Sequence, residues 1–383
     1  MNGLYIHVPF CLKKCGYCDF YSVTDLQLTG AFIKALCDEI RTVAGQEAPE
    51  NRRLDTVYFG GGTPSLLPAT DLHTVLKTAG KCYDLDPDTE ITLEMNPGTV
   101  SSDYLKQIRD IGVNRLSVGV QSFHDRALRF LGRIHTARET ENILHSARDL
   151  GFDNVGIDII HGLPGQTTHD LEEDLSKALA FEPAHLSCYM LSYEEGTPLD
   201  LKRQKGQLKP LSENRVTGLF QHTVNFLEKA GYLHYEISNF ARTPSTRSRH
   251  NMKYWDFLPY RGFGPSAHSF YPDSVTRCWN VRDIRGYVTL ISNGHSAEKG
   301  REILTRDQMI TEAIFLGLRK RDGLDLALFH QRFDMDFIEQ FKDVIDLFLK
   351  QNLVDISDQR ISLSRKGLVF ADHITARLVE CIP

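Results

Sequence analysis

The sequence has no apolar run that approaches the roughly twenty residues needed to cross a membrane. Its first residues also lack the charged segment followed by an apolar segment that marks a secretory signal. Basic residues are not in excess, because the net charge is −6 and the pI is about 6.2. That balance gives no general attraction to nucleic acid. We therefore expect a cytoplasmic protein with no transmembrane segment and no nucleic-acid partner.

Two further absences narrow the chemistry. The run 60–62 is three glycines, but no Gly-Lys-Ser/Thr follows it, so a nucleoside triphosphate loop is not indicated. Asp19 follows the Cys-x-x-Cys at 15–18, where covalent c-type haem attachment requires histidine. The five cysteines beyond residue 20 are scattered singly, which is typical of reduced core thiols in a cytosolic protein.

What the sequence does contain is a group of three cysteines near its start. Cys11, Cys15 and Cys18 have the spacing C-x3-C-x2-C directly after a strand-like run at 4–8. Soft thiolates select zinc, copper or iron–sulfur clusters. An electron-carrier cluster needs four cysteines, whereas three leave one iron of a four-iron cubane open to an exchangeable ligand. The spacing favours an open [4Fe–4S] cluster.

Two plainer interpretations of this loop stay open on the residues alone. Structural zinc needs four ligands, and His7 could supply the fourth from the preceding strand. The Cys15–Cys18 pair could also be a thioredoxin-like redox pair, although that interpretation leaves Cys11 unexplained.

Apolar, β-branched runs alternate with amphipathic segments of helical length through the first half of the chain. The runs lie at 4–8, 56–59, 91–95, 115–120, 155–160 and 186–191, and the helical segments at 32–43, 72–82, 104–111, 139–150 and 171–181. Such alternation predicts an α/β fold with a parallel sheet and right-handed crossovers. Six units are too few for a closed eight-stranded barrel, so we expect a partial (β/α)6 TIM-like barrel over residues 1–235.

Polar and glycine-rich residues follow the predicted strands where active sites of α/β barrels lie. Glu94, Gln121 and Asp158 offer acceptors for hydroxyl or ammonium groups, and Arg133 offers a fork for a carboxylate. The glycines at 60–62 let backbone N–H groups approach a ligand closely. Each feature alone is also ordinary turn chemistry, and an arginine at a helix start is commonly a surface residue.

The second half begins with a helical segment at 216–227 and a possible strand at 235–240. We expect residues 236–300 to extend the barrel, with the glycine-rich stretch 262–268 as a loop that returns to the rim. His250 and Tyr254 are i,i+4 neighbours if their segment is helical, and Trp255 follows. Either side chain could ligate haem iron. The alternative is a structural cap with satisfied hydrogen bonds.

Residues 301–383 have a different pattern. Helices are predicted at 309–318, 337–351 and 366–378, with a two-stranded wing at 353–356 and 361–363. This order predicts a winged-helix-like α+β domain. The domain contains 12 Lys and Arg against 14 Asp and Glu, a net of −2, so it lacks the basic footprint of a DNA-binding wing. We expect a docking or lid domain.

With these motifs the chain resembles the radical S-adenosylmethionine superfamily, because the three-cysteine loop follows the first strand and Tyr17 precedes the third cysteine. The stretch 61–64 with Glu94, Gln121, Arg133 and Asp158 resembles the oxygen-independent coproporphyrinogen III oxidase-like family, which includes haem chaperones of the HemW type. The segments 234–240, 250–255 (His-Asn-x-x-Tyr-Trp) and 262–269 resemble the HemW type. The oxidases carry a further cysteine where this chain has Phe20.

The resemblance implies roles for individual residues. Cys11, Cys15 and Cys18 would hold a [4Fe–4S] cluster whose open iron binds S-adenosylmethionine, with Tyr5, Tyr17, Gly61 and Glu94 around that ligand. Gly62, Thr63, Gln121, Arg133, Asp158 and Ser192 correspond to a second S-adenosylmethionine site of the oxidases. His250, Tyr254 and Trp255 become the candidates for haem contact. The cluster's electron would come from a flavodoxin- or ferredoxin-type partner.

Two functions of different classes follow from the resemblance. The first is a haem chaperone that binds haem and transfers it to an acceptor protein, without porphyrinogen turnover. The alternative is an enzyme, an oxygen-independent coproporphyrinogen III oxidase that oxidatively decarboxylates its substrate in porphyrin biosynthesis. Phe20 favours the chaperone.

Overall fold

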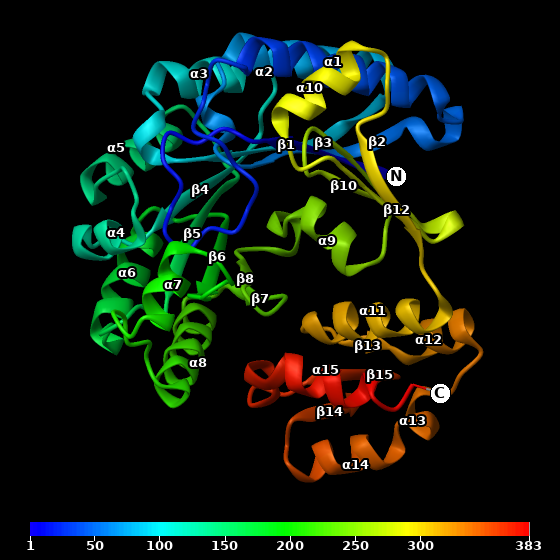
Figure 1. Ribbon diagram of the computed structural model, residues 1–383. Coiled ribbons are helices and arrows are strands. Elements are labelled where there is room, and N and C mark those ends of the chain that lie inside the picture. The colour runs from blue at the N-terminus through cyan, green and yellow to red at the C-terminus, as the bar shows by residue number, and fades with distance from the viewer. Residues whose placement is uncertain (383) are drawn as a thin grey trace.

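The computed structural model describes residues 1–382. All six expected strands form, and each pairs in parallel with the next along the chain (Figure 1). They are β1 (Asn2–Val8), β2 (Arg53–Gly61), β3 (Asp84–Met95), β4 (Arg115–Gln121), β5 (Val155–His161) and β6 (His185–Met190). The predicted partial (β/α)6 barrel is confirmed.

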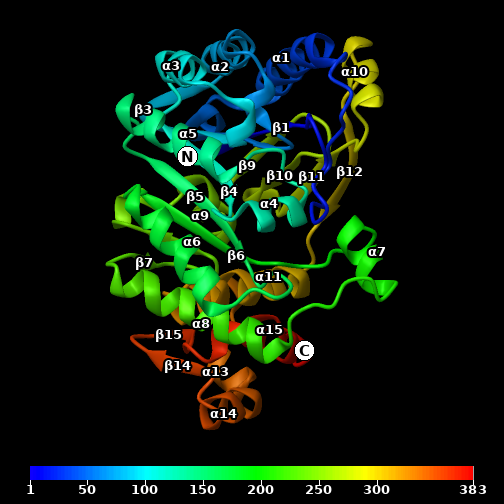
Figure 2. The same ribbon diagram turned by 90° about the vertical axis from the view of Figure 1, so that its left-hand side faces the viewer.

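Eight helices follow the strands of the barrel in the described part of the chain, and six of them were expected; the first helix after β4 and the first after β6 were not, and Figure 2 shows the latter apart from the rest. The eight helices are α1 (Thr29–Gln46), α2 (Ala69–Cys82), α3 (Ser102–Asp110), α4 (Asp125–Leu131), α5 (Ala137–Asp149), α6 (Thr168–Ala180), α7 (Pro198–Gln204) and α8 (Glu213–Lys229). Thr136 and Thr167 begin α5 and α6 with capping boxes, in which the threonine and the third helical residue satisfy each other's backbone donors. Short 3₁₀ helices lie at Pro49–Arg52, Pro64–Leu66 and Pro97–Thr99.

The second half extends the same sheet at both edges, giving twelve strands among the described residues. One edge receives β9 (Tyr260–Phe263) parallel to β1, then antiparallel β10 (His268–Tyr271), β11 (Thr276–Asn280) and β12 (Glu298–Ile303); the other receives β8 (Asn239–Ala241) and β7 (Leu233–His234). Helices α9 (Arg249–Trp255) and α10 (Ile284–Ser292) and 3₁₀ turns at Pro244–Thr246 and Pro272–Ser274 connect them.

One expectation for this region holds and one is wrong. The glycine-rich stretch 262–268 does return to the rim, because Gly264 packs on the backbone of His7 at the end of β1, although its first two residues belong to β9. The run 235–240 is mostly the turn between β7 and β8, in which the N–H of Tyr235 donates to the carbonyl of Asn239 at 3.2 Å. Apolar content alone could not distinguish this tight turn from a strand.

The C-terminal module follows β12 as a group of helices around a three-stranded sheet of order β13-β15-β14. Its elements are α11 (Arg306–Arg319), β13 (Leu324–Asp325), α12 (Leu326–Phe333), α13 (Phe337–Gln340), α14 (Lys342–Lys350), β14 (Val354–Ser357), β15 (Arg360–Leu363), a 3₁₀ turn (Gly367–Phe370) and α15 (Ala371–Val379). The winged-helix-like pattern is present. The helix expected at 337–351 is interrupted at Phe341, whose ring is buried beside that of Phe337. The helix expected at 366–378 begins as the 3₁₀ turn.

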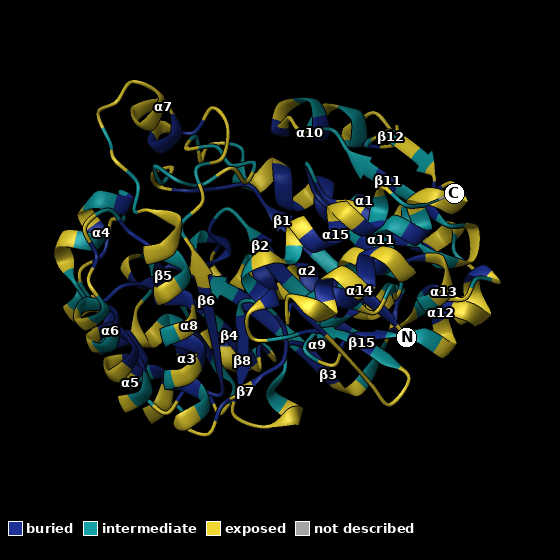
Figure 3. Cartoon of the chain, turned by 90° about the horizontal axis from the view of Figure 1, so that it is seen from below, coloured by how far each residue is buried: buried dark blue, intermediate teal, exposed yellow. Residues whose placement is uncertain are grey.

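Strand alternation decides which side chains face the barrel interior. Leu4, Ile6 and Val8 of β1 are fully buried in the main apolar core, whereas Tyr5 and His7 point to the opposite face. Figure 3 shows the buried sheet beneath helices whose outer sides are exposed. Polar side chains on the inner face of neighbouring strands therefore meet inside the barrel. No helix within residues 1–382 combines the length and apolarity that crossing a bilayer would require.

Candidate functional site

The three cysteines lie on the loop between β1 and α1, and backbone hydrogen bonds hold this loop on two sides. The N–H of Cys11 donates to the carbonyl of Val23 at 2.9 Å. Gly16 donates to the carbonyl of Leu131 in α4 at 3.1 Å and accepts from the N–H of Leu199 in α7 at 2.9 Å. The path of the loop is thus fixed by contacts with two helices far along the chain.

The thiols themselves have cationic and hydroxyl neighbours. Thr63 Oγ1 donates to Cys11 Sγ at 3.5 Å, and Arg133 Nη1 donates to Cys15 Sγ at 3.6 Å. Burial raises the pKa of the Cys18 thiol, and the two other thiols raise it further. Across residues 1–382, no three ligand side chains converge as one metal ion requires. A four-iron cubane binds each thiolate on a different iron, so this donor set fits a cluster.

His7 is not free to act as the fourth ligand of a zinc site. Its Nε2 lies 2.9 Å from the carbonyl oxygen of Tyr21, and its Nδ1 lies 3.1 Å from the hydroxyl of Tyr5. Burial lowers the pKa of His7 to about 4. The ring is a buried neutral group that ties the end of β1 to the cysteine loop.

The glycine stretch after β2 is shaped by close contact with the cysteine loop. Gly61 has φ of +106°, and its N–H donates to Glu94 Oε2 at 3.1 Å. A Cβ at Gly62 would lie only 2.6 Å from the carbonyl oxygen of Phe10. The N–H of Thr63 donates to that same carbonyl at 2.7 Å. Glycine is needed here because two backbones meet where side chains would not fit.

Glu94, at the end of β3, is a half-buried carboxyl group with two donors. Tyr58 Oη donates to its Oε1 at 2.7 Å, and Gly61 donates to its Oε2. Burial raises the pKa of Glu94 to about 7; the bond from Tyr58 opposes that rise and the nearby Asp158 adds to it. Such a carboxyl gains its negative charge readily when a cation binds beside it.

Asp158, Gln121 and Arg133 complete the polar lining. Burial raises the pKa of Asp158 to about 6, although Ser117 Oγ donates to both carboxyl oxygens at 3.2 and 3.3 Å. Arg133 Nη2 donates to the carbonyl of Gly119 at 2.8 Å. Gln121 has φ of +68°, an unusual value for a non-glycine residue and one that is typical of functional sites.

These groups surround one cavity of about 550 Å³ at the carboxyl ends of the strands. Nine of the ten residues proposed for S-adenosylmethionine line it: Tyr17, Gly61, Gly62, Thr63, Glu94, Gln121, Arg133, Asp158 and Ser192. The tenth, Tyr5, lies behind the lining, with its ring stacked on that of Tyr58 at 6.1 Å. Cys18 also reaches the cavity. Two carboxyl groups and one guanidinium can hold a zwitterion with hydroxyl groups. The N–H groups of the glycine stretch do not face a ligand as expected, because those of Gly61 and Gly62 donate to Glu94 and to the carbonyl of Val8.

Comparison with known proteins connects this geometry to a family. Residues 5–178 match the model of the radical SAM superfamily, and residues 304–370 match that of the HemN C-terminal domain. The heme chaperone HemW of Lactococcus lactis is 33% identical over 97% of this chain and 96% of its own length. The chain belongs to the HemW family. Heme chaperone HemW of Escherichia coli is 35% identical over 80% of this chain and 79% of its own.

A solved structure supports the same fold for the HemW-family chain. Coproporphyrinogen III oxidase (HemN) from Escherichia coli, described as a radical SAM enzyme, superposes with a TM-score of 0.83 and 26% identity. The superposition covers 98% of this chain and 89% of the oxidase. The two functions weighed on the sequence thus correspond to two relatives of one architecture.

In this HemW-family chain, the residues proposed for haem contact lie on α9, outside the 550 Å³ cavity. His250 is 1% exposed; its Nδ1 lies 2.8 Å from Thr56 Oγ1 and its Nε2 2.9 Å from Tyr254 Oη. Burial lowers the pKa of His250 to about 3. Tyr58 lies between His250 and the cavity, since its ring stacks on His250 at 5.1 Å and its hydroxyl reaches Glu94. Ligation of iron by His250 would require one of its two hydrogen bonds to break.

Helix α9 connects the barrel with the C-terminal module. The carboxylate of Glu90 in β3 accepts from the N–H groups of Arg249 and His250, at 3.2 Å each. At the other end, the Arg319 guanidinium of α11 lies 4.5 Å from the ring centre of Trp255. The HNxxYW segment at 250–255 is therefore anchored in two parts of the fold.

Three hydroxyl-bearing residues of the site were not assigned a role from the sequence: Ser117 and Tyr189, which line the cavity, and Tyr58, which lies behind its lining. Tyr58 orients Glu94, Ser117 binds Asp158, and Tyr189 borders the same cavity. Strand alternation would have located them, because each is separated by an even number of residues from an inward-facing neighbour on its strand. Their chemical type, hydroxyl groups in apolar strands, gave no separate signal.

Proposed function

We propose that this chain binds haem and passes it to an acceptor protein. The observation that carries the proposal is its likeness to proteins named heme chaperones, which runs through both the barrel and the C-terminal module. The HNxxYW segment at 250–255, held between those two parts, supports it further. Boundaries at about residues 235 and 300 would divide the chain into three parts. The first part, the barrel, would hold the cofactor site, and the parts after it would handle haem.

The proposal includes a [4Fe–4S] cluster and S-adenosylmethionine at the strand ends. Cys11, Cys15 and Cys18 would hold three irons, and the ligand of the fourth would lie against Tyr17, Gly61 and Glu94. When bound and reduced, this pair supplies a 5′-deoxyadenosyl radical in radical enzymes of the superfamily. The chain's own part would be to orient the ligand: Glu94 would accept a hydrogen bond from its amino group. Arg133, assigned to the second site, lies against Cys15.

A flavodoxin- or ferredoxin-type protein is the proposed source of the electron. Helix α7 contacts the cysteine loop through Leu199, and the exposed Lys202, Lys205 and Lys209 lie on and just after it. This local positive charge contrasts with the net charge of −6 and suits an acidic partner. The eight free cysteines fit a reducing cytoplasm.

Coproporphyrinogen III oxidase is the second candidate function, and the 0.83 TM-score to that enzyme is the observation that favours it. The resemblance disfavours it at Phe20, which is 69% exposed at the edge of the cavity and stands where the oxidases have a cysteine.

One side-by-side experiment separates the two functions. The reconstituted protein is given haemin, with absorbance recorded in the Soret region, and in parallel coproporphyrinogen III with reductant and S-adenosylmethionine. We expect a Soret shift with haemin and no protoporphyrinogen. Steady formation of protoporphyrinogen would assign the chain to the oxidase instead.

His250 can be tested in the same assay. We expect His250→Ala to weaken the haemin-induced Soret shift, for one of two reasons. In the first, His250 ligates iron after giving up its hydrogen bond to Thr56 or Tyr254. In the second, His250 does not ligate iron but holds Tyr254 in place. Thr56→Val separates the two explanations. It removes one hydrogen-bond partner of His250 and leaves the imidazole ring with a free Nδ1. This variant should therefore not weaken haemin binding if His250 is the ligand. An unchanged spectrum in His250→Ala would remove this residue from the haem site.

A further inference from the structure

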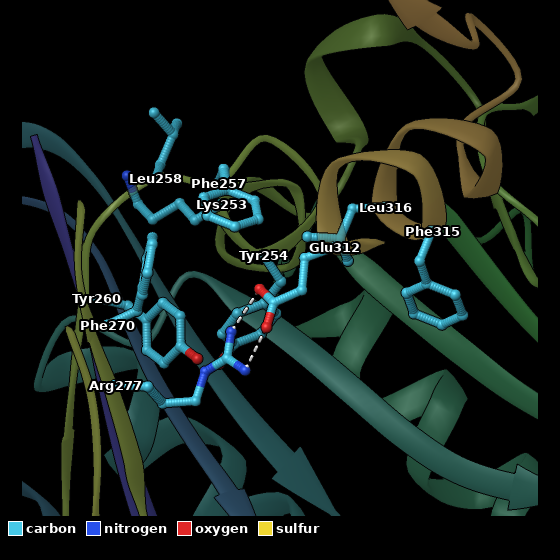
Figure 4. A pocket seen from close by; sticks show the side chains of 10 residues that line it. All are labelled: Lys253, Tyr254, Phe257, Leu258, Tyr260, Phe270, Arg277, Glu312, Phe315 and Leu316. Atoms are coloured by element: carbon cyan, nitrogen blue, oxygen red, sulfur yellow. Dashed lines mark hydrogen bonds and ion pairs between the residues drawn. The ribbon is translucent and has the colours of Figure 1, made fainter. Parts of the chain in front are cut away.

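A second cavity, of about 330 Å³, lies where α9, the edge strands β9–β11 and α11 meet. Its lining is largely aromatic and apolar: Tyr254, Phe257, Leu258, Tyr260, Phe270, Phe315 and Leu316. Figure 4 shows Tyr260 and Phe270 on the strand side and Phe315 and Leu316 on the helix α11. None of these residues borders the cavity beside the cysteine loop.

Three charged residues also line the cavity: Lys253, which pairs with Asp55 at 2.6 Å, and Arg277 and Glu312, which pair with each other. Arg277 of β11 donates to Glu312 of α11 through two hydrogen bonds, Nη1 to Oε1 at 2.6 Å and Nη2 to Oε2 at 2.7 Å. Both side chains are about three-quarters buried, with 28% and 21% exposed. The Arg277 guanidinium also lies 5.8 Å from the ring centre of Phe270. The protein's own carboxylate is thus bound in a guanidinium fork next to flat rings.

The HNxxYW segment reaches this cavity through Tyr254 and not through His250. Tyr254 is one of the lining residues, and its ring meets that of Tyr260 edge-on at 4.7 Å. His250 lies behind Tyr254, with its Nε2 bonded to the Tyr254 hydroxyl. A ligand held near this segment would therefore meet Tyr254 first.

The chemistry of the lining selects a class of ligand. Flat aromatic side chains favour a flat apolar molecule, and a guanidinium fork favours a carboxylate on its edge. The volume is at the lower end of the roughly 300–1,000 Å³ typical of ligand sites. A macrocycle would therefore insert one edge, past Phe315, which is 41% exposed at the opening.

We propose that one edge of haem enters this cavity, with a propionate replacing Glu312 on Arg277. This inference rests on the proposed haem-binding function and adds the place and the anchoring group. Haem held by one edge leaves the remainder of the ring accessible to an acceptor protein. Because Glu312 belongs to α11, the exchange also releases this bidentate contact between β11 and the C-terminal module.

The test compares the two members of the ion pair. Arg277→Gln removes the propionate's partner, so we expect haemin affinity to fall about tenfold to a hundredfold. Glu312→Gln removes the competing carboxylate and leaves Arg277, so we expect affinity to rise severalfold. A purely structural pair would lower thermal stability and haemin affinity in both variants, so the opposite signs identify the exchange.

Two controls sharpen the result. Haemin dimethyl ester, whose propionates are masked, should bind wild type and Arg277→Gln equally. The exposed pair Arg301–Glu298 on β12 offers matched variants, Arg301→Gln and Glu298→Gln, which should leave haemin affinity unchanged. Equal losses in Arg277→Gln and Glu312→Gln, or no change in either, would overturn the inference. Failure of the wild-type protein to bind haemin would instead overturn the proposed function.

Discussion

The Glu94 carboxyl group changes protonation near neutral pH, which few glutamates do. Its pKa of about 7 results mainly from burial, and the neighbouring Asp158 adds to the effect. Asp158, with a pKa of about 6, shows the same behaviour for the same reason. Two carboxyl groups held in a site that disfavours their charge are typical of a place built for a cation. At the scale of single residues, pH is therefore the direct probe of the cavity.

Affinity for S-adenosylmethionine should rise with pH through 7, because its ammonium group binds the ionised form of Glu94. For a pKa of about 7, the expected gain between pH 6 and pH 8 is about tenfold. Calorimetric titration of the reconstituted protein measures it. Glu94→Gln should bind more weakly and with little pH dependence. An equally steep pH profile in that variant would assign the titration to another group.

The same pKa shift predicts a gain in stability when the carboxyl group is removed. The folded-state pKa lies above the ordinary 4.5, so this group's contribution to stability is complete below about pH 4.5 and is lost as pH rises through 7. We expect Glu94→Gln to raise the melting temperature at pH 8 and not at pH 5. The gain in unfolding free energy at pH 8 should be on the order of 2–3 kcal/mol. Glu195→Gln, at an exposed position, is the control. A gain of equal size at both pH values would contradict the assignment.

At the scale of elements, the end of β2 and the cysteine loop determine each other's position. Gly62 allows the two backbones to approach, and Thr63 bonds both the carbonyl of Phe10 and the thiol of Cys11. Helix α7 adds a second contact to the loop through Leu199 and brings lysines next to it. The cluster site is thus formed by elements from three parts of the chain.

Gly62→Ala should reduce cluster loading, since the added Cβ would lie 2.6 Å from the carbonyl of Phe10 and backbone cannot rotate away. Anaerobic reconstitution should give roughly four irons per wild-type chain and clearly fewer in the variant. Gly218→Ala in α8, where a Cβ meets nothing within 4 Å, should keep full loading and gain about 0.5–1 kcal/mol of stability. Full loading in Gly62→Ala would show that the loop can move aside.

Reversing charge on the α7 segment should slow electron delivery to the cluster. In Lys202→Glu/Lys205→Glu, we expect reduction by a flavodoxin to slow about tenfold at low salt, because steering of an acidic partner is lost. Dithionite should reduce the variant at the wild-type rate. Lys342→Glu/Lys350→Glu on α14 is the matched control. Equal flavodoxin rates in both variants would place the docking surface elsewhere.

At the scale of the whole molecule, two cavities lie in different parts of one continuous fold. The larger is at the strand ends of the barrel, and the smaller is between the extended sheet edge and α11. They share no lining residue, and Tyr58, His250 and Tyr254 form the packed connection between them. This arrangement separates the cofactor site from the proposed place of haem.

Haem binding should therefore persist without the cluster. We expect Cys11→Ala/Cys15→Ala/Cys18→Ala to contain no iron–sulfur cluster and to bind haemin within about threefold of the wild-type affinity. Iron and sulfide analysis with a Soret titration on the same sample checks both. Loss of haemin binding in a variant that keeps its melting temperature would show that the cluster region belongs to the haem site.

The sequence by itself determined the barrel and most of its rim. Alternating apolar runs predict parallel strands, and the carboxyl ends of such strands meet at one edge, so the sequence alone places Glu94, Gln121 and Asp158 together. The spacing of Cys11, Cys15 and Cys18 indicated the cluster in the same local way. These signals depend on neighbours in the chain.

Only the tertiary structure decided which residues that are distant in the sequence contact one another. The spacing of His250 and Tyr254 could not show that Thr56 and Tyr254 occupy both nitrogens of His250, because Thr56 is 194 residues away. Nor could it show that Arg277 and Glu312 meet inside an aromatic cavity. The physical reason is that hydrogen bonding and burial depend on which surfaces pack together. The cysteine loop could be identified from sequence, and the setting of the HNxxYW segment could not.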